Sequence, residues 1–198
     1  VTTLESPVTL KIWERRTLVA NLVAQTGIVL TGAIVRLTSS GLGCPTWPEC
    51  VEGSIAPTST QTESWHKYVE FGNRLLTFVL LIIALLTIAA IRAHNKARAA
   101  SGLNKRRPLT LLAVGSLVGI FGQAILGGIT VLTGLHPLTV AAHFIVSIGL
   151  ITVAQVLLTK AQDPNDAPVV SLVPAPIAIG MRIHIWLALS LVAVGTLV

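Results

Sequence analysis

The segment GLGCPTWPEC, residues 41–50, places two thiols six positions apart in a chain that is otherwise mostly apolar. Cys44 and Cys50 are the only cysteines of the sequence. Pro45 and Pro48 disfavour a helix between them and restrict the unfolded chain, so closure of a small ring is feasible. The pair therefore has two interpretations: a disulfide that stabilises a loop, or a redox-active pair that reacts with a thioredoxin-like protein.

A second set of reactive side chains lies in apolar segments. In HKYVEFGNRLL, Glu70, Asn73 and Arg74 are three and four positions apart, so they share one face of a helix. Ionisable groups are costly inside a bilayer, which makes them candidates for a functional role. The other interpretation of Glu70 and Arg74 is an ion pair at the mouth of the helix.

His143 lies about four residues, or roughly 6 Å, inside the apolar segment that begins at residue 139. Asn73 lies at a similar depth, so both side chains reach one layer of a helical bundle, where an imidazole can ligate a haem iron. Gln123 belongs to the glycine-rich stretch GSLVGIFGQAILGGITVL. Small residues there allow close helix packing or leave room for a flat macrocycle, and Gln123 could hydrogen-bond to another helix or to a ligand.

Apolar helices must position these side chains. The chain is 53% hydrophobic and 11% charged, with a mean hydropathy of +0.79, which indicates a membrane protein. Four segments are long enough to cross a bilayer, which takes about 20 residues: 18–37, 69–91, 109–133 and 139–159. A fifth begins near residue 183 and holds 16 residues, too few for a comfortable crossing. We expect an all-α polytopic fold, a four-helix antiparallel transmembrane bundle with a truncated fifth helix, and the chain to be a fragment.

The net charge of +6 is distributed unevenly along the sequence. Cationic residues gather before the first span and between the second and third; they are Lys11, Arg15, Arg16, Arg92, Lys96, Arg98, Lys105, Arg106 and Arg107. By the positive-inside rule, the N-terminus and the 92–107 link are cytoplasmic and the 38–68 cysteine loop is outside. We expect a multi-pass protein of the plasma (inner) membrane. The charge pattern thus indicates contact with the lipid bilayer rather than with nucleic acid. The outside compartment also permits a disulfide.

Three linked stretches resemble the heme A synthase family. They are GAIVRLTSSGLGCPTWPEC, HKYVEFGNR and GQAILGGITVLTGLHPLTVAAHF, and the resemblance covers residues from about 27 to 159. It implies eight helices in two four-helix halves, with haem O as substrate and haem b as cofactor. The implied reaction oxidises a ring methyl of haem O to a formyl group, giving the haem A of terminal oxidases. Residues 1–160 would be the N-terminal half, residues 161–182 a cytoplasmic linker and residues 183–198 the start of the second half.

The resemblance also implies roles for single residues. His143 matches an axial haem ligand, Glu70 a glutamate thought to assist catalysis, and Arg36 a position that could pair with a haem propionate. Arg74 and Gln123 complete the expected haem-binding set, together with Asn73. Cys44 and Cys50 match a disulfide proposed to act in redox chemistry or haem handover.

The sequence departs from the family pattern at two places. Asn73 stands where many members have a second histidine ligand, so either the iron is five-coordinate on His143, or His66 or another group takes that position. The C-terminal half, where haem b is expected, is absent apart from its first partial helix. The chain could then be the substrate half only.

Three functions follow as hypotheses. The first is a haem-modifying membrane oxidoreductase that acts with oxidase assembly factors and the farnesyltransferase that makes haem O. The second is a non-enzymatic haem-binding assembly or carrier module, which the missing half and Asn73 favour. The third, a quinone-linked thiol oxidase, is disfavoured because it would relay electrons through a second cysteine pair, and the sequence has none.

Overall fold

The computed structural model describes residues 8–163 and 173–197 of the chain. Five helices in these ranges are long and apolar enough to cross a membrane: α1 (Ile12–Leu37), α2 (His66–Ala100), α3 (Arg107–Leu132), α4 (Pro137–Gln162) and α5 (Ala175–Leu197). Within the same ranges the only β pairing is an isolated bridge between Val51 and Ser54. The predicted all-α membrane fold is therefore confirmed.

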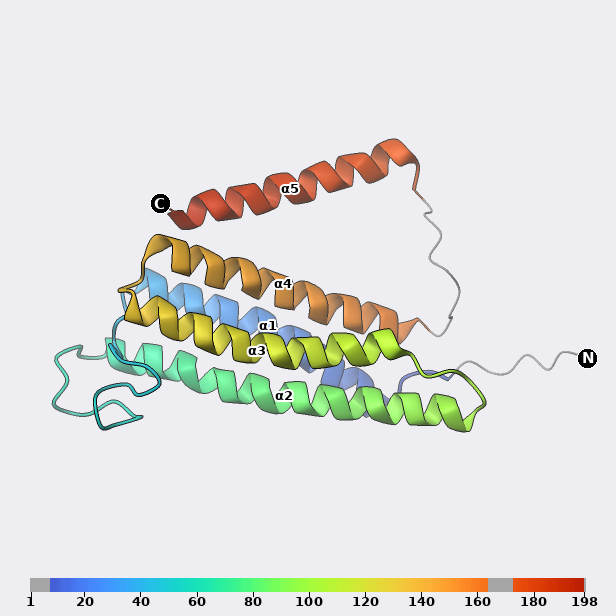
Figure 1. The fold of residues 1–198 in the computed structure, drawn as a ribbon, viewed down its shortest axis with the longest axis horizontal. Helices are drawn as coiled ribbons and strands as arrows, with labels where there is room; N and C mark the ends of the chain where they lie inside the picture. Colours follow the sequence, from blue (N-terminus) through green and yellow to red (C-terminus); the bar gives the residue numbers. More distant parts are fainter. Residues whose placement is uncertain (1–7, 164–172, 198) are drawn as a thin grey trace, which may run out of the picture.

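Helices α1 to α4 form an antiparallel bundle, and α5 lies along α4 outside it (Figure 1). In the bundle, α1 and α3 each pack against both α2 and α4. It follows that α2 and α4 lie diagonally opposite each other, so residues from both can approach the bundle axis at one level. The end that carries the cysteine segment 38–65 is called the disulfide end, and the opposite end, with residues 101–106, the basic end.

Local sequence accounts for the short connections. Pro108 and Pro137 stand in the first turns of α3 and α4, where a missing N–H costs nothing. Between these two helices the chain reverses over residues 133–136, and Gly134 adopts a φ of +62° that favours glycine. The short turn makes α3 and α4 antiparallel neighbours.

Several helix boundaries differ from those predicted by hydropathy. α2 continues to Ala100, so most of the predicted 92–107 link is helical. α5 begins at Ala175 rather than near residue 183 and has 23 residues, enough to cross a bilayer. Apolar runs mark the part of a helix that faces lipid, whereas Lys, Arg and Ala also favour helix beyond it. The division into residues 1–160, 161–182 and 183–198 stays a prediction, and residues 164–172 lie outside the described ranges.

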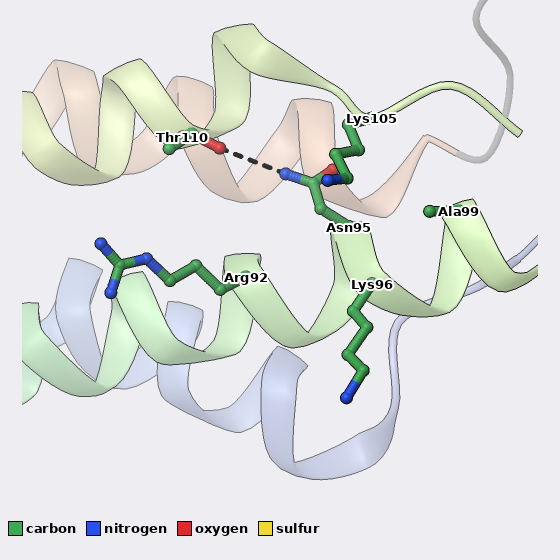
Figure 2. Close-up of a pocket in the computed structure, with 6 residues that line it drawn as sticks. All are labelled: Arg92, Asn95, Lys96, Ala99, Lys105 and Thr110. Carbon is green, nitrogen blue, oxygen red and sulfur yellow. Dashed lines mark hydrogen bonds between the residues drawn. The ribbon is translucent and has the colours of Figure 1, made fainter.

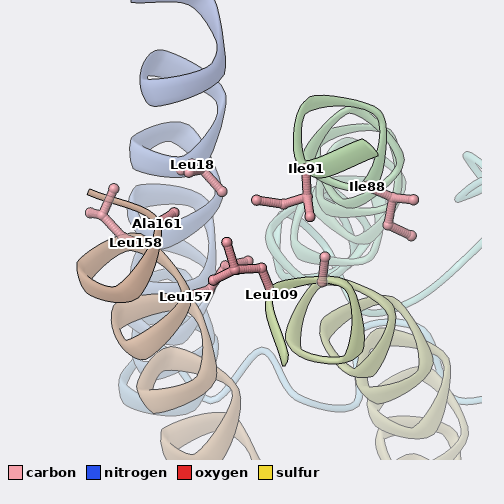
Figure 3. Packing of buried hydrophobic residues seen from close by; sticks show 8 residues of the cluster. Leu18, Ile88, Ile91, Leu109, Leu157, Leu158 and Ala161 are labelled. Carbon is pink, nitrogen blue, oxygen red and sulfur yellow. The ribbon is translucent and has the colours of Figure 1, made fainter. Parts of the chain in front are cut away.

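Two apolar clusters hold the four helices together. The larger lies toward the basic end (Figure 3) and contains Leu18, Ile88, Ile91, Leu109, Ala113, Leu157, Leu158 and Ala161. The smaller, nearer the middle, contains Leu80, Ala84 and Ile120. Many other large apolar side chains point outward, including Leu30, Phe78 and Val118, as lipid-facing residues do. Packing within the bundle therefore depends on close contact, because lipid is as apolar as the core.

We expect Gly119→Ala to destabilise the contact between α3 and α4. A Cβ at Gly119 would overlap the Leu150 side chain, whereas a Cβ at Gly122 of the same helix would meet nothing within 4 Å. Overpacking of this kind costs about 1–3 kcal/mol. Thermal unfolding in detergent should show a lower Tm for Gly119→Ala and an unchanged Tm for Gly122→Ala. Equal Tm values for the two variants would contradict the close packing of α3 on α4.

Candidate functional site

Cys44 and Cys50 form a disulfide at the disulfide end, and both are fully buried. The ring lies against the first turn of α2. A Cβ at Gly43 would be only 2.5 Å from the carbonyl oxygen of His66, so a glycine is needed for this approach. Gln61 donates from Nε2 to the carbonyl oxygen of Gly43 and so joins a second part of the loop to the ring.

Glu70 and Arg74 hold this ring to α2. Glu70 Oε2 accepts a hydrogen bond from the backbone N–H of Cys44 at 2.7 Å, and Oε1 pairs with Arg74 Nη2 at 2.6 Å. The guanidinium of Arg74 also donates to the carbonyl oxygens of Cys44, Thr46 and Glu49. The ion pair predicted as the alternative for Glu70 is therefore present, and it connects the helix to both sides of the disulfide ring.

Glu70 and Arg74 are called the clamp below. A layer of polar side chains lies next to them in the bundle. On one side Thr31 of α1 donates to Asn73 Oδ1 of α2 at 2.7 Å. On the other side Gln123 of α3 donates from Nε2 to the carbonyl oxygen of His143 at 3.0 Å and to Ser147 Oγ. We call these five residues the polar layer. Asn73 and His143 belong to α2 and α4, which lie diagonally opposite each other, and their common depth stays a prediction.

The imidazole of His143 is the one ionisable side chain of the polar layer. Its Nδ1 is buried and has no hydrogen-bond partner, and no other described residue hydrogen-bonds to the ring. A Cβ at Gly127 would lie 3.3 Å from His143 Cε1, so the glycine gives the ring its room. Gln123 Oε1 is also buried without a partner. Because buried polar atoms are almost always satisfied, these two atoms are candidates for contact with a ligand, and a neutral imidazole is a suitable donor to haem iron.

The described residues offer no obvious second axial ligand. Asn73 uses its Oδ1 to accept from Thr31. His66 is the first residue of α2, where its Nδ1 lies 2.9 Å from Ser40 Oγ and its ring stacks on Trp65. His136 acts as the N-cap of α4 and accepts from the N–H of Leu138. His143 is thus the histidine near the disulfide end whose ring nitrogens are not engaged.

Arg36 lies apart from the polar layer. It is exposed in the last turn of α1, and no hydrogen bond or ion pair of its side chain occurs within the described ranges. Its predicted pairing with a haem propionate stays a prediction. Arg74, in contrast, is paired with Glu70 and donates to backbone carbonyl oxygens of the disulfide ring.

Trp47 was not predicted as a site residue. It lies between Cys44 and Cys50 and packs against α3. A Cβ at Gly128 would lie 2.5 Å from Trp47 Cδ2, so the indole packs directly on that glycine. Gly127, the preceding residue, contacts His143, and adjacent Cα atoms are only about 3.8 Å apart. The two rings therefore pack against neighbouring positions of one helix. The glycine pair was visible in the sequence, but nothing local indicated which side chains would fill the space it leaves.

Gly128→Ala should push the Trp47 indole off α3. We expect a red shift of Trp47 fluorescence in a protein whose Trp13, Trp65 and Trp186 are replaced by Phe, because the ring becomes more exposed to water. Gly122→Ala, with open space at its Cβ, is the matched control and should leave the emission unchanged. An unshifted spectrum for Gly128→Ala would show that the indole does not rest on this helix.

A buried pair at the basic end was also missed. His94 Nδ1 of α2 lies 3.8 Å from Glu14 Oε2 of α1, and each side chain is 1% exposed. Glu14 Oε2 also accepts from the backbone N–H of Lys11 at the start of α1. The sequence suggested no role for His94, because its neighbours are cationic and its partner is eighty positions away.

Comparison with known proteins points to one family. The COX15-CtaA family model, described as cytochrome oxidase assembly protein, matches residues 15–198. No solved structure matches the chain.

Three curated relatives illustrate the similarity, and each carries the name heme A synthase. The relative from Geobacillus kaustophilus is 31% identical over 144 residues, which cover 72% of this chain and 41% of the relative. For Lysinibacillus sphaericus the identity is 37% over 142 residues (71% and 41%), and for Bacillus licheniformis 34% over 140 residues (69% and 40%). The chain thus matches about two fifths of the length of these relatives.

Proposed function

Because the chain belongs to the COX15-CtaA family of cytochrome oxidase assembly proteins, we propose that it is the haem O-binding half of a membrane oxidoreductase that converts haem O to haem A. The observation that carries the proposal is the His143 imidazole, which lies in the polar layer with a buried, unpartnered Nδ1. The similarity to heme A synthases supports the reaction class.

In this proposal the substrate is held by residues of the polar layer. His143 is the axial ligand of the haem O iron, and the absence of a side chain at Gly127 leaves the imidazole its place. Gln123 fixes the helix that carries the ligand, because it hydrogen-bonds to the backbone of His143 itself. Asn73 Oδ1 accepts from Thr31, so this side chain would not be needed to hold the haem.

Glu70 is proposed to orient water, or to take a proton from it, at the methyl group that is oxidised. Its carboxylate oxygens keep lone pairs beyond the hydrogen bonds from Cys44 and Arg74. It lies three residues from Asn73, about one helical turn closer to the disulfide end. Haem b, which the family places in the other half of the protein, would supply electron transfer when bound.

We also propose a membrane orientation and partner proteins for the chain. We propose a cytoplasmic basic end and an outside disulfide loop on the distribution of Lys and Arg. The plasma (inner) membrane is proposed on the similarity to bacterial heme A synthases. The farnesyltransferase that makes haem O and oxidase assembly factors are proposed partners. A thioredoxin-like reductant is proposed for the Cys44–Cys50 disulfide, whose burial protects it while the loop stays in place.

A second candidate function is a haem-binding carrier module without its own chemistry. It is favoured by Asn73, whose Oδ1 already accepts a hydrogen bond from Thr31. The experiment that separates the two places the chain alone in membranes that contain haem O and no other heme A synthase. Haem A in the extracted pigments would exclude the carrier function. Bound but unconverted haem O would exclude activity of this chain alone, and absence of bound haem O would contradict both.

A further inference from the structure

An open pocket lies between α2 and α3 at the basic end (Figure 2). It is near the last residue of α2, whereas Asn73 of the polar layer is near the first. Its volume is about 440 Å³, and it is lined by Arg92, Asn95, Lys96, Ala99, Lys105 and Thr110. Arg92 and Lys96 extend from α2, while Lys105 belongs to the segment that leads into α3. Nothing in the proposed haem chemistry uses this place.

The pocket lies where the apolar parts of α2 and α3 end and their cationic parts begin. Residues 75–91 of α2 carry no charge, so Arg92 is the first charged residue after the apolar run. On α3 the uncharged run begins at residue 108, immediately after Arg107 and next to Thr110 of the pocket. Both helices therefore change from apolar to cationic at the pocket, which places it where hydrocarbon gives way to lipid phosphates.

The pocket is lined by three cations that have no carboxylate partner among the described residues. Arg92, Lys96 and Lys105 are exposed, and none of their side chains forms an ion pair or hydrogen bond with any residue in 8–163 or 173–197. The carboxylate of Glu14, at the same end of the bundle, is buried beside His94. Three cations around one opening favour an anionic ligand.

A buried side chain fixes the shape of the pocket. Asn95 is 7% exposed; its Nδ2 donates to Thr110 Oγ1 at 3.1 Å, and its Oδ1 accepts from the backbone N–H of Arg106 at 2.9 Å. These bonds join α2 to the start of α3, as the dashed line in Figure 2 shows for the first of them. Arg92 and Lys96 are thus mounted on α2, and Lys105 lies in the link 101–106, whose last residue is bonded to Asn95 of that helix.

We propose that this pocket binds the phosphate group of an anionic phospholipid. The three cations supply the charge for a phosphate at the level where lipid phosphates lie, and basic pockets between transmembrane helices recognise such headgroups. Leu111, which follows Thr110 toward the bilayer centre, is 72% exposed and offers apolar surface to an acyl chain. A lipid rather than free phosphate is the source, because the site lies beside the hydrocarbon layer.

The test uses the full chain purified in a non-ionic detergent and titrated with phosphatidylglycerol, with bound lipid counted by native mass spectrometry. Phosphatidylcholine with the same acyl chains tests the need for net negative charge, and inorganic phosphate tests the source. The pocket variant is Arg92→Gln with Lys96→Gln and Lys105→Gln. The control variant, Arg15→Gln with Arg16→Gln and Arg107→Gln, removes the same charge from exposed residues of this end that do not line the pocket. Circular dichroism verifies that both variants keep their helices.

We expect phosphatidylglycerol to bind at least about tenfold more tightly than phosphatidylcholine, and the pocket variant to lose at least about tenfold in affinity while the control stays within about twofold. Equal losses in the two variants would overturn the proposal, because they would indicate diffuse attraction by the whole basic end. Unchanged binding in the pocket variant would overturn it as well. Displacement of the lipid by an equal concentration of inorganic phosphate would show a site for free phosphate instead.

Discussion

His143→Ala is expected to remove haem from the purified protein. The imidazole is the unpartnered donor of the polar layer, and alanine leaves the iron without a ligand from the described residues. We expect haem affinity to fall at least about tenfold, a change of at least about 1.4 kcal/mol in binding free energy, seen as loss of the Soret band after reconstitution with haem O. His136→Ala is the matched control, because that ring caps α4 outside the polar layer.

The same spectra decide the coordination of the iron. In the wild-type protein, reduced bands of a five-coordinate haem would agree with His143 as the single axial ligand and with Asn73 held by Thr31. Six-coordinate bands that become five-coordinate in His66→Ala would instead show that His66 leaves Ser40 to ligate. A Soret band that survives unchanged in His143→Ala would mean that the haem is held elsewhere, and the proposed site would be wrong.

Glu70→Gln is expected to cause the second large effect, a loss of stability. It breaks the ion pair with Arg74, and Glu70 is only 5% exposed. The glutamine keeps the shape but leaves the Arg74 guanidinium without its counter-charge. Loss of one partner of such a pair costs about 3 kcal/mol of unfolding free energy. We expect a lower Tm in detergent and faster reduction of the Cys44–Cys50 disulfide by dithiothreitol, because the carboxylate no longer holds the Cys44 N–H.

Arg74→Gln separates the structural role of Glu70 from the proposed chemical one. Both substitutions weaken the clamp on the disulfide ring, so both should accelerate reduction of the disulfide. If Glu70 also handles a proton or a water during oxidation of the methyl group, haem A formation by the complete protein should fall much further in Glu70→Gln than in Arg74→Gln. Equal losses of activity would leave Glu70 as a residue that only positions the loop.

Hydropathy located most of the helices but not all of their boundaries. The apolar runs identified α1 to α4, since a run of about 20 apolar residues matches the length of helix that crosses the hydrocarbon core. The extension of α2 through Arg92 and Arg98 to Ala100 was not anticipated, because charged residues that favour helix carry no hydropathy signal. For the same reason α5 was predicted to start after Arg182, whereas the helix includes it.

Part of the site could be predicted from the spacing of residues in the sequence. Glu70 and Arg74 stand four positions apart, so their pairing followed from helix geometry alone. The shared depth of Asn73 and His143, predicted by counting residues from the helix ends, stays a prediction. In contrast, no local rule could show that Glu70 also accepts from Cys44, or that Asn73 turns to Thr31 of α1, because both contacts depend on how the helices and the loop are placed relative to one another.

Three properties follow from the order of the residues alone: the chain is a helical membrane protein, its cysteines share one loop, and Glu70 and Arg74 share one helix face. They depend on hydropathy and on the rise and period of a single helix. The packing of Trp47 on Gly128 and the burial of His94 against Glu14 became known only from the folded chain. The physical reason is that such contacts depend on the rotation of each helix about its axis and on the closure of long loops, which join residues far apart in the chain.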